Sequence, residues 1–358
     1  MLALSEVANP SSVHGAGRHA RRLVETARSA LAYEIGGRAE DIVFTSGGTE
    51  ANALAIKGAL SLISDAVVLY TDLEHPAVKA AIEVSDAPNA RVGLTSDGKI
   101  DLHDLRARLG ALAEGQTPFL CLMLASNETG VIQPVADAAR LVRDAGGLTH
   151  CDGVQGLGKL SVNVALLGVD YLALSAHKFG GPQGAGALWF RAGAPLKPVQ
   201  TGGGQEKSLR SGTENVPGIA GFGAAVKAID LADMKRVQSV RDRFEALIGQ
   251  SAPVTFFGKE SERLPNTSNF ALEGFAGETQ VMAMDLNGVA VSSGSACSSG
   301  KVRKSETLLA MGQSDSMAAS AIRVSFGWAS TLDDAERAAS AWLKAARRAV
   351  PDAFKESA

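Results

Sequence analysis

Short, largely apolar runs alternate with amphipathic stretches through the first two thirds of the chain. The runs do not alternate strictly between apolar and polar positions, which indicates strands that are buried on both faces. Between several runs, apolar residues recur at helical spacing, as in Leu23, Val24, Ala27, Ala30 and Leu31. The predicted strands span residues 42–45, 67–70, 119–125, 148–151, 171–174 and 187–190.

This order of strands and helices predicts an α/β fold, with a mainly parallel sheet between two layers of helices. Ligands of such sheets bind beyond the carboxyl ends of the strands. Residues that directly follow a predicted strand are therefore the first candidates for a functional site.

The pattern changes near Leu231, where a long helix begins that is marked by Val237, Val240, Phe244 and Leu247. Shorter strand-like segments and a final helix follow it. The segments are 267–272, 288–292 and 322–326, and the final helix has a capped start at 330–334. We therefore predict a large domain over residues 1–232 and a small C-terminal domain over residues 233–358.

Composition excludes several classes of protein. The 358 residues are 46% hydrophobic and carry a formal net charge of −3, which gives no electrostatic reason to expect nucleic acid or a membrane surface as partner. No apolar run approaches the ~20 residues that span a bilayer, and the first residues lack the features of a signal peptide. Three widely spaced cysteines do not form a disulfide framework, so we expect a cytoplasmic protein.

The first strand is followed by Ser46, Gly47, Gly48, Thr49 and Glu50, and then by a predicted helix. Glycines before a helix allow backbone N–H groups to approach a ligand closely, and a helix N-terminus favours an anion. The segment therefore suggests a phosphate cradle to which Thr49 adds a hydroxyl group. The alternative is a tight turn in which Thr49 is a helix N-cap.

Two further strand ends carry charged residues. Asp152 follows the 148–151 strand, where an acid is poorly solvated and needs a cationic partner. A protonated pyridine nitrogen would supply one, although a lone acid here is also typical of an N-cap or of a buried acid whose hydrogen bonds are satisfied within the chain. Lys178 follows the 171–174 strand among small residues, where His177 and the crevice could lower its pKa for Schiff-base chemistry. The alternative, a solvated surface lysine, is uncommon directly after four apolar strand residues.

A phosphate cradle, a buried acid and a lysine at a strand end are the three anchors that pyridoxal phosphate needs. Two other residues after strands fit the same cofactor. His75 could stack on its ring, and Asn127 could donate a hydrogen bond to its phenolic oxygen.

These segments, read together, resemble the motifs of the NifS/IscS-type cysteine desulfurases, and the likeness runs from Asn9 to beyond Arg323. The matching stretches are Phe44 to Asn52, Glu74 to Val78, Ser126 to Gly130, His150 to Gln155 and Ser175 to Pro182. The resemblance implies the aspartate-aminotransferase-like fold of pyridoxal-phosphate enzymes, with a mainly parallel seven-stranded sheet and a smaller α+β C-terminal domain.

The resemblance also implies roles for individual residues. Lys178 would form the Schiff base, Asp152 would pair with the pyridine nitrogen and His75 would stack on the ring. Gln155 and Asn127 would lie near the phenolic oxygen and the substrate. The residues expected to hold the phosphate are Gly48, Thr49, Ser175 and His177, joined across a homodimer by Thr213 of the neighbouring subunit.

Cys297 lies among serines, glycines and alanine, a composition that predicts a loop. An exposed thiol in such a loop suits a reactive role, although it could also be a surface cysteine without one. By contrast, Cys121 falls within a strand, and Cys151 should point away from the side that Asp152 faces. We assign neither of these a catalytic role.

Together these parts imply a reaction in which L-cysteine loses its sulfur to Cys297 as a persulfide and leaves as alanine. Arg323 would hold the substrate carboxylate, the alternative being a strand-edge arginine in a surface ion pair. The Cys297 context resembles the NifS/IscS subgroup, which implies delivery to an iron–sulfur scaffold or another sulfur acceptor. No resident metal is expected, and any iron at Cys297 would be transient.

Other functions compatible with the sequence stay open. A selenocysteine lyase would use the same residues, whereas an aminotransferase of this fold has no need of Cys297. Family members usually open with a Leu-Asp-x-x-Ala-Thr-like strand near the substrate pocket, and no such segment precedes Asn9 here. The third alternative is therefore a truncated, non-catalytic scaffold that binds assembly partners.

Overall fold

The structure, a computed structural model, describes residues 8–294 and 304–355. The chain divides into two compact units, which are described separately below. The first comprises Met1–Gly93, Asp101–Leu124 and Gln133–Ile229, and the second comprises Leu94–Ile100, Ala125–Ile132 and Asp230–Ala358. In the described part of the chain, no helix is both long enough and apolar enough to cross a membrane.

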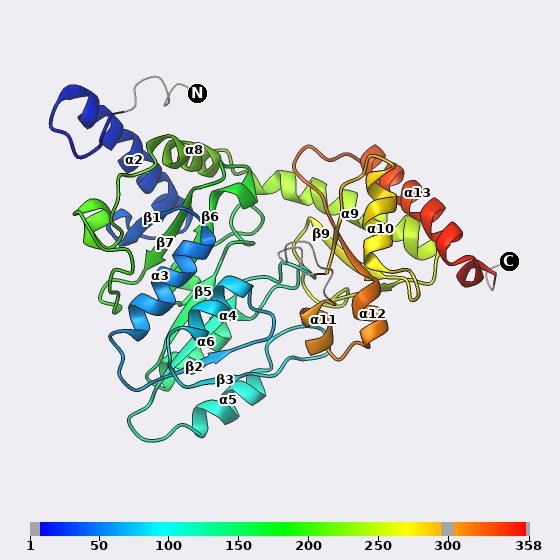
Figure 1. Ribbon diagram of the computed structural model, residues 1–358, viewed down its shortest axis with the longest axis horizontal. Helices are drawn as coiled ribbons and strands as arrows, with labels where there is room; N and C mark the ends of the chain where they lie inside the picture. The colour runs from blue at the N-terminus through cyan, green and yellow to red at the C-terminus, as the bar shows by residue number, and fades with distance from the viewer. Residues whose placement is uncertain (1–7, 295–303, 356–358) are drawn as a thin grey trace. The chain divides into compact units, whose positions relative to one another are not determined.

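The first unit is built on a seven-stranded sheet with the strand order β1-β7-β6-β5-β4-β2-β3 (Figure 1). All neighbouring strands pair in parallel except β7, which is antiparallel to both β1 and β6. The strands are β1 (Ile42–Thr45), β2 (Ala66–Tyr70), β3 (Asn89–Arg91), β4 (Thr117–Met123), β5 (Leu148–Asp152), β6 (Tyr171–Ser175) and β7 (Gly186–Phe190). The predicted mainly parallel sheet is confirmed.

Helices cover both faces of this sheet. Val43 packs in one buried cluster with Ala51 of α3 and Val78 of α4. The next residue, Phe44, faces the other side, where its ring lies 5.9 Å from that of Phe222 in α8. Figure 1 shows α8 beside α2. The helices of this unit are α2 (Gly15–Glu34), α3 (Gly48–Leu60), α4 (Pro76–Glu83), α5 (Leu102–Gly110), α6 (Val135–Asp144), α7 (Val164–Leu167) and α8 (Val216–Lys227), with short 3-10 turns η1 (Ala39–Asp41), η2 (Ala176–Phe179) and η3 (Gln205–Ser208).

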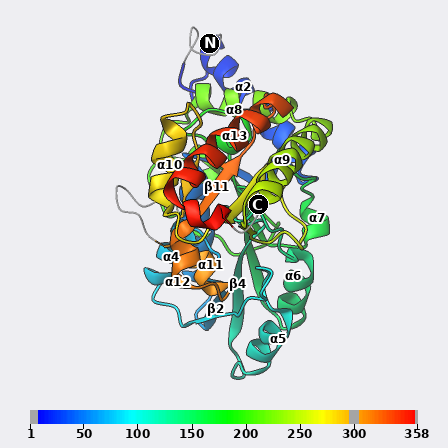
Figure 2. The ribbon, with the colours of Figure 1, turned by 90° about the vertical axis from the view of Figure 1, so that its right-hand side faces the viewer.

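The second unit contains a four-stranded antiparallel sheet with the order β10-β11-β9-β8. Its strands are β8 (Thr255–Phe256), β9 (Thr267–Ala271), β10 (Ser292–Ser293) and β11 (Ala321–Ser325). Its helices are α9 (Leu231–Ser251), α10 (Gly277–Asp285), α11 (Glu306–Ala310), α12 (Asp315–Ser320) and α13 (Leu332–Ala349), followed by η4 (Pro351–Phe354). Figure 2 shows α9 and α13 side by side.

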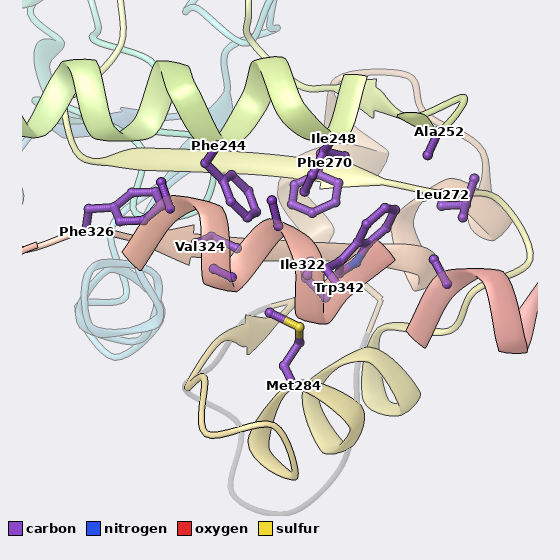
Figure 3. Close-up of a cluster of buried hydrophobic side chains, with 14 of the residues drawn as sticks. Phe244, Ile248, Ala252, Phe270, Leu272, Met284, Ile322, Val324, Phe326 and Trp342 are labelled. Carbon is purple, nitrogen blue, oxygen red and sulfur yellow. The ribbon is translucent and has the colours of Figure 1, made fainter. Parts of the chain in front are cut away.

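An aromatic core holds the second unit together (Figure 3). Trp342 of α13 is fully buried, and its ring lies 5.1 Å from that of Phe270 in β9. Phe244 of α9 packs on Phe270 at 5.8 Å. The indole Nε1 of Trp342 donates to Gln280 Oε1 at 2.8 Å, so the one polar atom of this ring is satisfied. Truncating such a core aromatic to alanine typically costs about 3–5 kcal/mol.

Local signals explain several boundaries. The predicted capped start of the last helix is confirmed, because Thr331 and Asp334 form a reciprocal capping box at the start of α13. The strand predicted at 288–292 is wrong for most of its length. Gly288, at φ +73°, and Val289 instead close the end of α10 through bonds to Asp285 O and Met284 O, so strand pairing begins only at Ser292.

Candidate functional site

The register of the first sheet brings three of the predicted site segments to one edge. Thr45 of β1 and Ser175 of β6 both pair with Gly186 of β7. Because β7 is antiparallel to both, β1 and β6 run in the same direction and end at the same level. Asp152 of β5 pairs with Ala173 of β6, two residues before the end of that strand. The residues after β1, β5 and β6 therefore share one edge of the sheet, where ligands of such folds bind.

The turn after β1 forms the start of α3. Gly47 is the N-cap residue, and no side chain of the described residues caps this helix. A Cβ on Gly48 would lie 2.6 Å from Val154 Cγ2, so a larger residue does not fit there. Thr49 occupies the first turn and is exposed. The alternative in which Thr49 is the N-cap is therefore wrong, and the uncapped N-terminus suits an anionic group.

Ser175 and His177 lie beside this turn. A Cβ on Gly48 would be 3.4 Å from Ser175 Cβ, which places the buried serine next to the start of α3. Its Oγ lies 3.0 Å from His177 Nδ1. Partial burial, together with the charges of Lys178 and Lys159, lowers the pKa of His177. These hydroxyl and imidazole groups complement the backbone donors expected to hold a phosphate.

Asp152 ends β5 and is only 6% exposed. Its Oδ2 accepts a hydrogen bond from Asn52 Nδ2 at 2.8 Å, and its Oδ1 accepts one from the Val154 N–H at 3.0 Å. Burial raises the pKa of Asp152, while these donors and the nearby His75 and Lys178 lower it again in part. Both hydrogen-bond donors are neutral, so the site would accommodate a cation that balances the carboxylate. The protonated ring nitrogen of pyridoxal phosphate is such a cation.

His75 is the N-cap of α4, where its Nδ1 accepts a hydrogen bond from the Ala77 N–H at 3.1 Å. This contact orients the ring and leaves Nε2 to carry the proton of the neutral form. Burial lowers the pKa of His75, the charge of Asp152 raises it in part, and that of Lys178 lowers it further. A neutral, oriented imidazole is the form that suits stacking on a flat cofactor.

Lys178 lies in η2, directly after β6, and is exposed in the single chain. The end of β6 lies at the same edge as Asp152 and the start of α3, and the charge of Lys178 acts on the pKa of His75, Asp152 and His177. Gln155 follows Asp152 by three positions, and its Oε1 accepts a bond from Lys159 Nζ at 3.0 Å. Lys178 is accessible, as Schiff-base formation requires.

Thr213 is exposed and lies on a segment that is tied to the turn after β1. Arg210 Nε donates to Glu50 Oε1 at 2.7 Å, and Glu50 Oε2 accepts from the Ser46 N–H at 2.8 Å. Burial would raise the pKa of Glu50, but the bonds from Arg210 and Ser46 lower it overall. The Thr213 segment is thus positioned by the same turn that begins α3.

Two residues at this edge escaped the sequence analysis. Asn52 lies on α3, one turn after Gly48, and donates to Asp152; a polar residue within the apolar part of a helix was the available signal. Glu74 precedes His75, and burial raises its pKa to about 8. Its Oε1 accepts from Thr71 Oγ1 and from the Met123 N–H, both at 3.1 Å. Glu74 is therefore a largely neutral acid beside a carboxylate site.

The remaining predicted residues belong to the second unit. Arg323 lies in β11, where its Nη1 donates to the Asn127 carbonyl at 2.5 Å and its Nη2 to Ser292 Oγ at 3.3 Å. Asn127 and Arg323 are thus brought together. Cys297 lies outside the described residues.

The two cysteines of the first unit, Cys121 and Cys151, are fully buried. Burial raises the pKa of both thiols, so neither is a reactive thiolate.

Comparison with known proteins agrees with this arrangement. The model of the aminotransferase class-V family matches residues 3–338. A cysteine desulfurase of Cereibacter sphaeroides is 39% identical over 93% of this chain and 87% of its own length. The cysteine desulfurase IscS of Dictyoglomus turgidum is 38% identical over 91% of this chain and 84% of its own length.

Solved structures show the same fold. A NifS-like protein from Rickettsia africae superposes with a TM-score of 0.88 at 31% identity, covering 96% of this chain and 93% of that one. A structure of SspA in complex with cysteine superposes with a TM-score of 0.78 at 28% identity, covering 90% and 91%. The predicted fold is confirmed, and the chain belongs to the aminotransferase class-V family, among the cysteine desulfurases.

Proposed function

We propose that this chain is a pyridoxal-phosphate-dependent cysteine desulfurase that moves the sulfur of L-cysteine onto its own Cys297 and releases L-alanine. The observation that carries the proposal is Asp152, a buried carboxyl with two neutral donors at the edge of the sheet where Lys178 and the start of α3 also lie. The names of the relatives and the cysteine bound to SspA support the same substrate.

The residues present fit the cofactor. Lys178 would bind its aldehyde carbon, Asp152 its ring nitrogen, and His75 one face of its ring. The phosphate would be held by Gly48, Thr49, Ser175 and His177, with Gln155 and Asn127 near the phenolic oxygen. When bound, pyridoxal phosphate supplies an electron sink for negative charge at the substrate α-carbon.

The side chains of this protein would then carry out four tasks. Arg323 holds the substrate carboxylate. Lys178 Nζ takes the proton from the α-carbon, then delivers one proton to the β-carbon and one back to the α-carbon; the second proton is the one that Cys297 gives up when it becomes a thiolate. Cys297, as thiolate, attacks the substrate Sγ, so that an S–S bond forms while the Cβ–Sγ bond breaks and leaves its electron pair with carbon. The products are a persulfide on Cys297 and alanine, which balances without an added oxidant or reductant.

We further propose that the enzyme acts as a homodimer in which Thr213 of each subunit reaches the phosphate of the other. The exposed Thr213 supports this, because its position is fixed by Arg210 and Glu50 while its side chain faces outward. The persulfide would pass to an iron–sulfur scaffold or another acceptor protein, in a reducing compartment such as the cytoplasm.

Alanine and sulfide formation from cysteine plus a thiol reductant tests the proposal, with the wild type compared with Cys297→Ala and Lys178→Ala. We expect stoichiometric products from the wild type and none from either variant, with the visible absorbance of the cofactor kept in Cys297→Ala. Product from Cys297→Ala at the wild-type rate would contradict the proposal. Selenocysteine as a second substrate distinguishes a lyase that accepts selenium only, and absence of bound cofactor would indicate a non-catalytic scaffold.

A further inference from the structure

The turn at residues 206–208, in the first unit, has a strained backbone that the proposed reaction does not explain. In the described part of the chain, four residues other than glycine have a positive φ, and three of them are consecutive: Glu206 at +43°, Lys207 at +61° and Ser208 at +64°. Residues with a Cβ rarely adopt this left-handed conformation, and they keep it only where surrounding contacts hold them there. The side chains of the turn make such contacts.

Glu206 forms a buried, bidentate ion pair with Arg28 of α2. Arg28 Nη2 donates to Glu206 Oε1 at 2.7 Å, and Arg28 Nη1 donates to Glu206 Oε2 at 2.8 Å. The side chain of Arg28 is 4% exposed and that of Glu206 is 2% exposed. Two parallel N–H···O bonds fix both groups in one geometry. Burying two charges is costly, and such a pair often adds no more stability than apolar residues would, so its further contacts indicate its role.

The same ion pair binds the open edge of β1. This strand lies at one end of the strand order and pairs with β7 on its other side. At the open edge, the Phe44 N–H donates to Glu206 Oε2 at 2.8 Å, and the Ile42 carbonyl accepts from Arg28 Nη1 at 2.8 Å. Lys207 Nζ donates to the same carbonyl at 3.3 Å. These three side chains thus take the place of a neighbouring strand along β1.

The strand that is held in this way leads directly into the turn expected to bind the phosphate. Phe44 lies four positions before Gly48, where α3 begins. Arg28 also packs over the ring of Phe44, with its Cζ 4.9 Å from the ring centroid. The segment that follows the strained turn binds the first turn of α3, because Arg210 Nε donates to Glu50 Oε1. Residues 206–210 therefore contact the chain both before and after the start of α3.

We propose that Glu206 is a positioning residue for the phosphate group of the cofactor. With Arg28 and Lys207, it holds the end of β1, and with it the uncapped N-terminus of α3, in the position that binds the phosphate. This inference rests on the proposed function and adds which buried group fixes its phosphate cradle. The strained turn is the conformation that brings Glu206 and Lys207 to one strand edge. Because a helix N-terminus binds an anion only when its N–H groups point at it, a displaced turn should weaken affinity for the phosphate alone.

Two ligands that differ only in the phosphate test the proposal. The dissociation constants of pyridoxal phosphate and of pyridoxal are measured on the cofactor-free full chain, from the visible absorbance of the bound aldehyde. We expect the wild type to bind pyridoxal phosphate more tightly. In Glu206→Gln, which removes the charge and one carboxylate acceptor, the constant for pyridoxal phosphate should rise about tenfold, and that for pyridoxal should stay within about twofold. A general loss of stability would instead weaken both ligands together.

Glu245→Gln is the matched control. Glu245 forms a similarly buried, bidentate pair with Arg263 in the second unit, with N–O distances of 2.9 and 3.0 Å. Its variant should leave both dissociation constants within about twofold of wild type. Lys207→Met removes an exposed ammonium group and keeps the buried pair. It should raise the constant for pyridoxal phosphate about threefold and leave that for pyridoxal unchanged.

Three results would overturn the inference. These are a wild-type ratio of the two constants in Glu206→Gln, an equal rise in both constants, and a change of the ratio in Glu245→Gln as large as in Glu206→Gln. Lys207→Met decides the question by the same ratio if Glu206→Gln does not fold. A wild type that prefers pyridoxal phosphate but forms no alanine would refute the proposed reaction and leave this inference standing. A wild type that binds both ligands equally would refute the cofactor assignment and the inference together.

Discussion

Each of the two units buries an acidic side chain that accepts two hydrogen bonds, but the donors come from different parts of the chain. Among the described residues, the donors to Asp152 in the first unit are an amide side chain and a backbone N–H, and burial raises the pKa of Asp152. Glu128 in the second unit accepts from two buried hydroxyls, with which it holds α11. All four donors are neutral, so what differs is where they come from: the donors to Glu128 both lie at the start of α11, which this carboxyl ties down, whereas Asp152 lies at the end of β5, at the edge of the sheet where ligands of such folds bind.

Glu74 shows a third solution. Its Oε2 has no hydrogen-bond partner among the described residues. Burial raises the pKa of Glu74 to about 8, so the carboxyl stays largely protonated below that pH. A neutral acid beside Asp152 avoids placing two negative charges at one edge of the sheet. Of these two acids, Asp152 is therefore the one that can pair with a positively charged ligand.

The largest effect is expected for Asp152→Asn. The amide can keep the bond from the Val154 N–H but cannot balance a protonated ring nitrogen, so kcat/KM for alanine formation should fall about 10²–10³-fold. Steady-state alanine assays on cofactor-saturated protein measure this. Activity within threefold of wild type would show that Asp152 does not serve the ring nitrogen.

The same variant should have the opposite effect on stability without cofactor. Because the folded-state pKa of Asp152 is raised, its ionisation opposes folding increasingly as pH rises through that pKa. Asp152→Asn should therefore stabilise the cofactor-free protein more at pH 8 than at pH 3, which lies below the ordinary pKa of an aspartic acid, as urea unfolding can show. Destabilisation at both pH values would contradict this account of the buried carboxyl.

Glu128→Ala, in contrast to Asp152→Asn, should destabilise the folded protein. Removing the acceptor leaves two buried hydroxyls without their partner, which we expect to lower the free energy of unfolding by about 3 kcal/mol. Urea unfolding with and without cofactor measures the change. A loss below about 0.5 kcal/mol would mean that Glu128 is not the structural group that its contacts indicate.

Glu74→Gln should change the pH dependence of stability. With the folded-state pKa raised to about 8 and an ordinary unfolded value of 4.5, the unfolded chain releases this proton first. The contribution of Glu74 is therefore present at low pH and is lost as pH rises toward 8, by about 1.4 kcal/mol for each pH unit. Between pH 6 and pH 7, the free energy of unfolding should therefore decline less in the variant than in the wild type. Parallel pH profiles for the two proteins would show that Glu74 is not protonated.

The smallest effect is expected for Arg210→Gln. The ion pair of Arg210 with Glu50 is partly exposed, so its loss should cost no more than about 1 kcal/mol of unfolding free energy. If the proposed homodimer shares its site, cofactor affinity should nevertheless weaken a few-fold, because the Thr213 segment loses its tie to the turn after β1. Equilibrium binding of pyridoxal phosphate to the cofactor-free protein, with Arg140→Gln as an exposed control, measures this difference.

The first unit shows how much of a site a sequence can predict. Thr49, Asp152 and Lys178 could be identified because each lies at the end of a strand or in the turn that follows it, and the pattern of apolar residues locates strand ends within a residue or two. The β3 strand was missed because its exposed edge position lacks an apolar run, and β8 because two residues carry no period.

The second unit shows which features a sequence does not predict. Glu128 meets Ser305 across 177 positions of sequence, and no local pattern predicts which buried acid pairs with which hydroxyl. Nor does a pattern indicate that Leu94–Ile100 and Ala125–Ile132 fold with the C-terminal part of the chain. Such contacts follow from tertiary packing alone, which sequence periodicity does not encode.

The most direct test of the proposed reaction is to locate the transferred sulfur. The cofactor-loaded enzyme would be mixed with one equivalent of L-cysteine without reductant, digested, and analysed by mass spectrometry alongside the alanine released. The proposal predicts one added sulfur atom on the peptide that contains Cys297, in proportion to the alanine formed, and none on the Cys121 or Cys151 peptides. Alanine formed without a persulfide on Cys297, or with the sulfur on another cysteine, would contradict it.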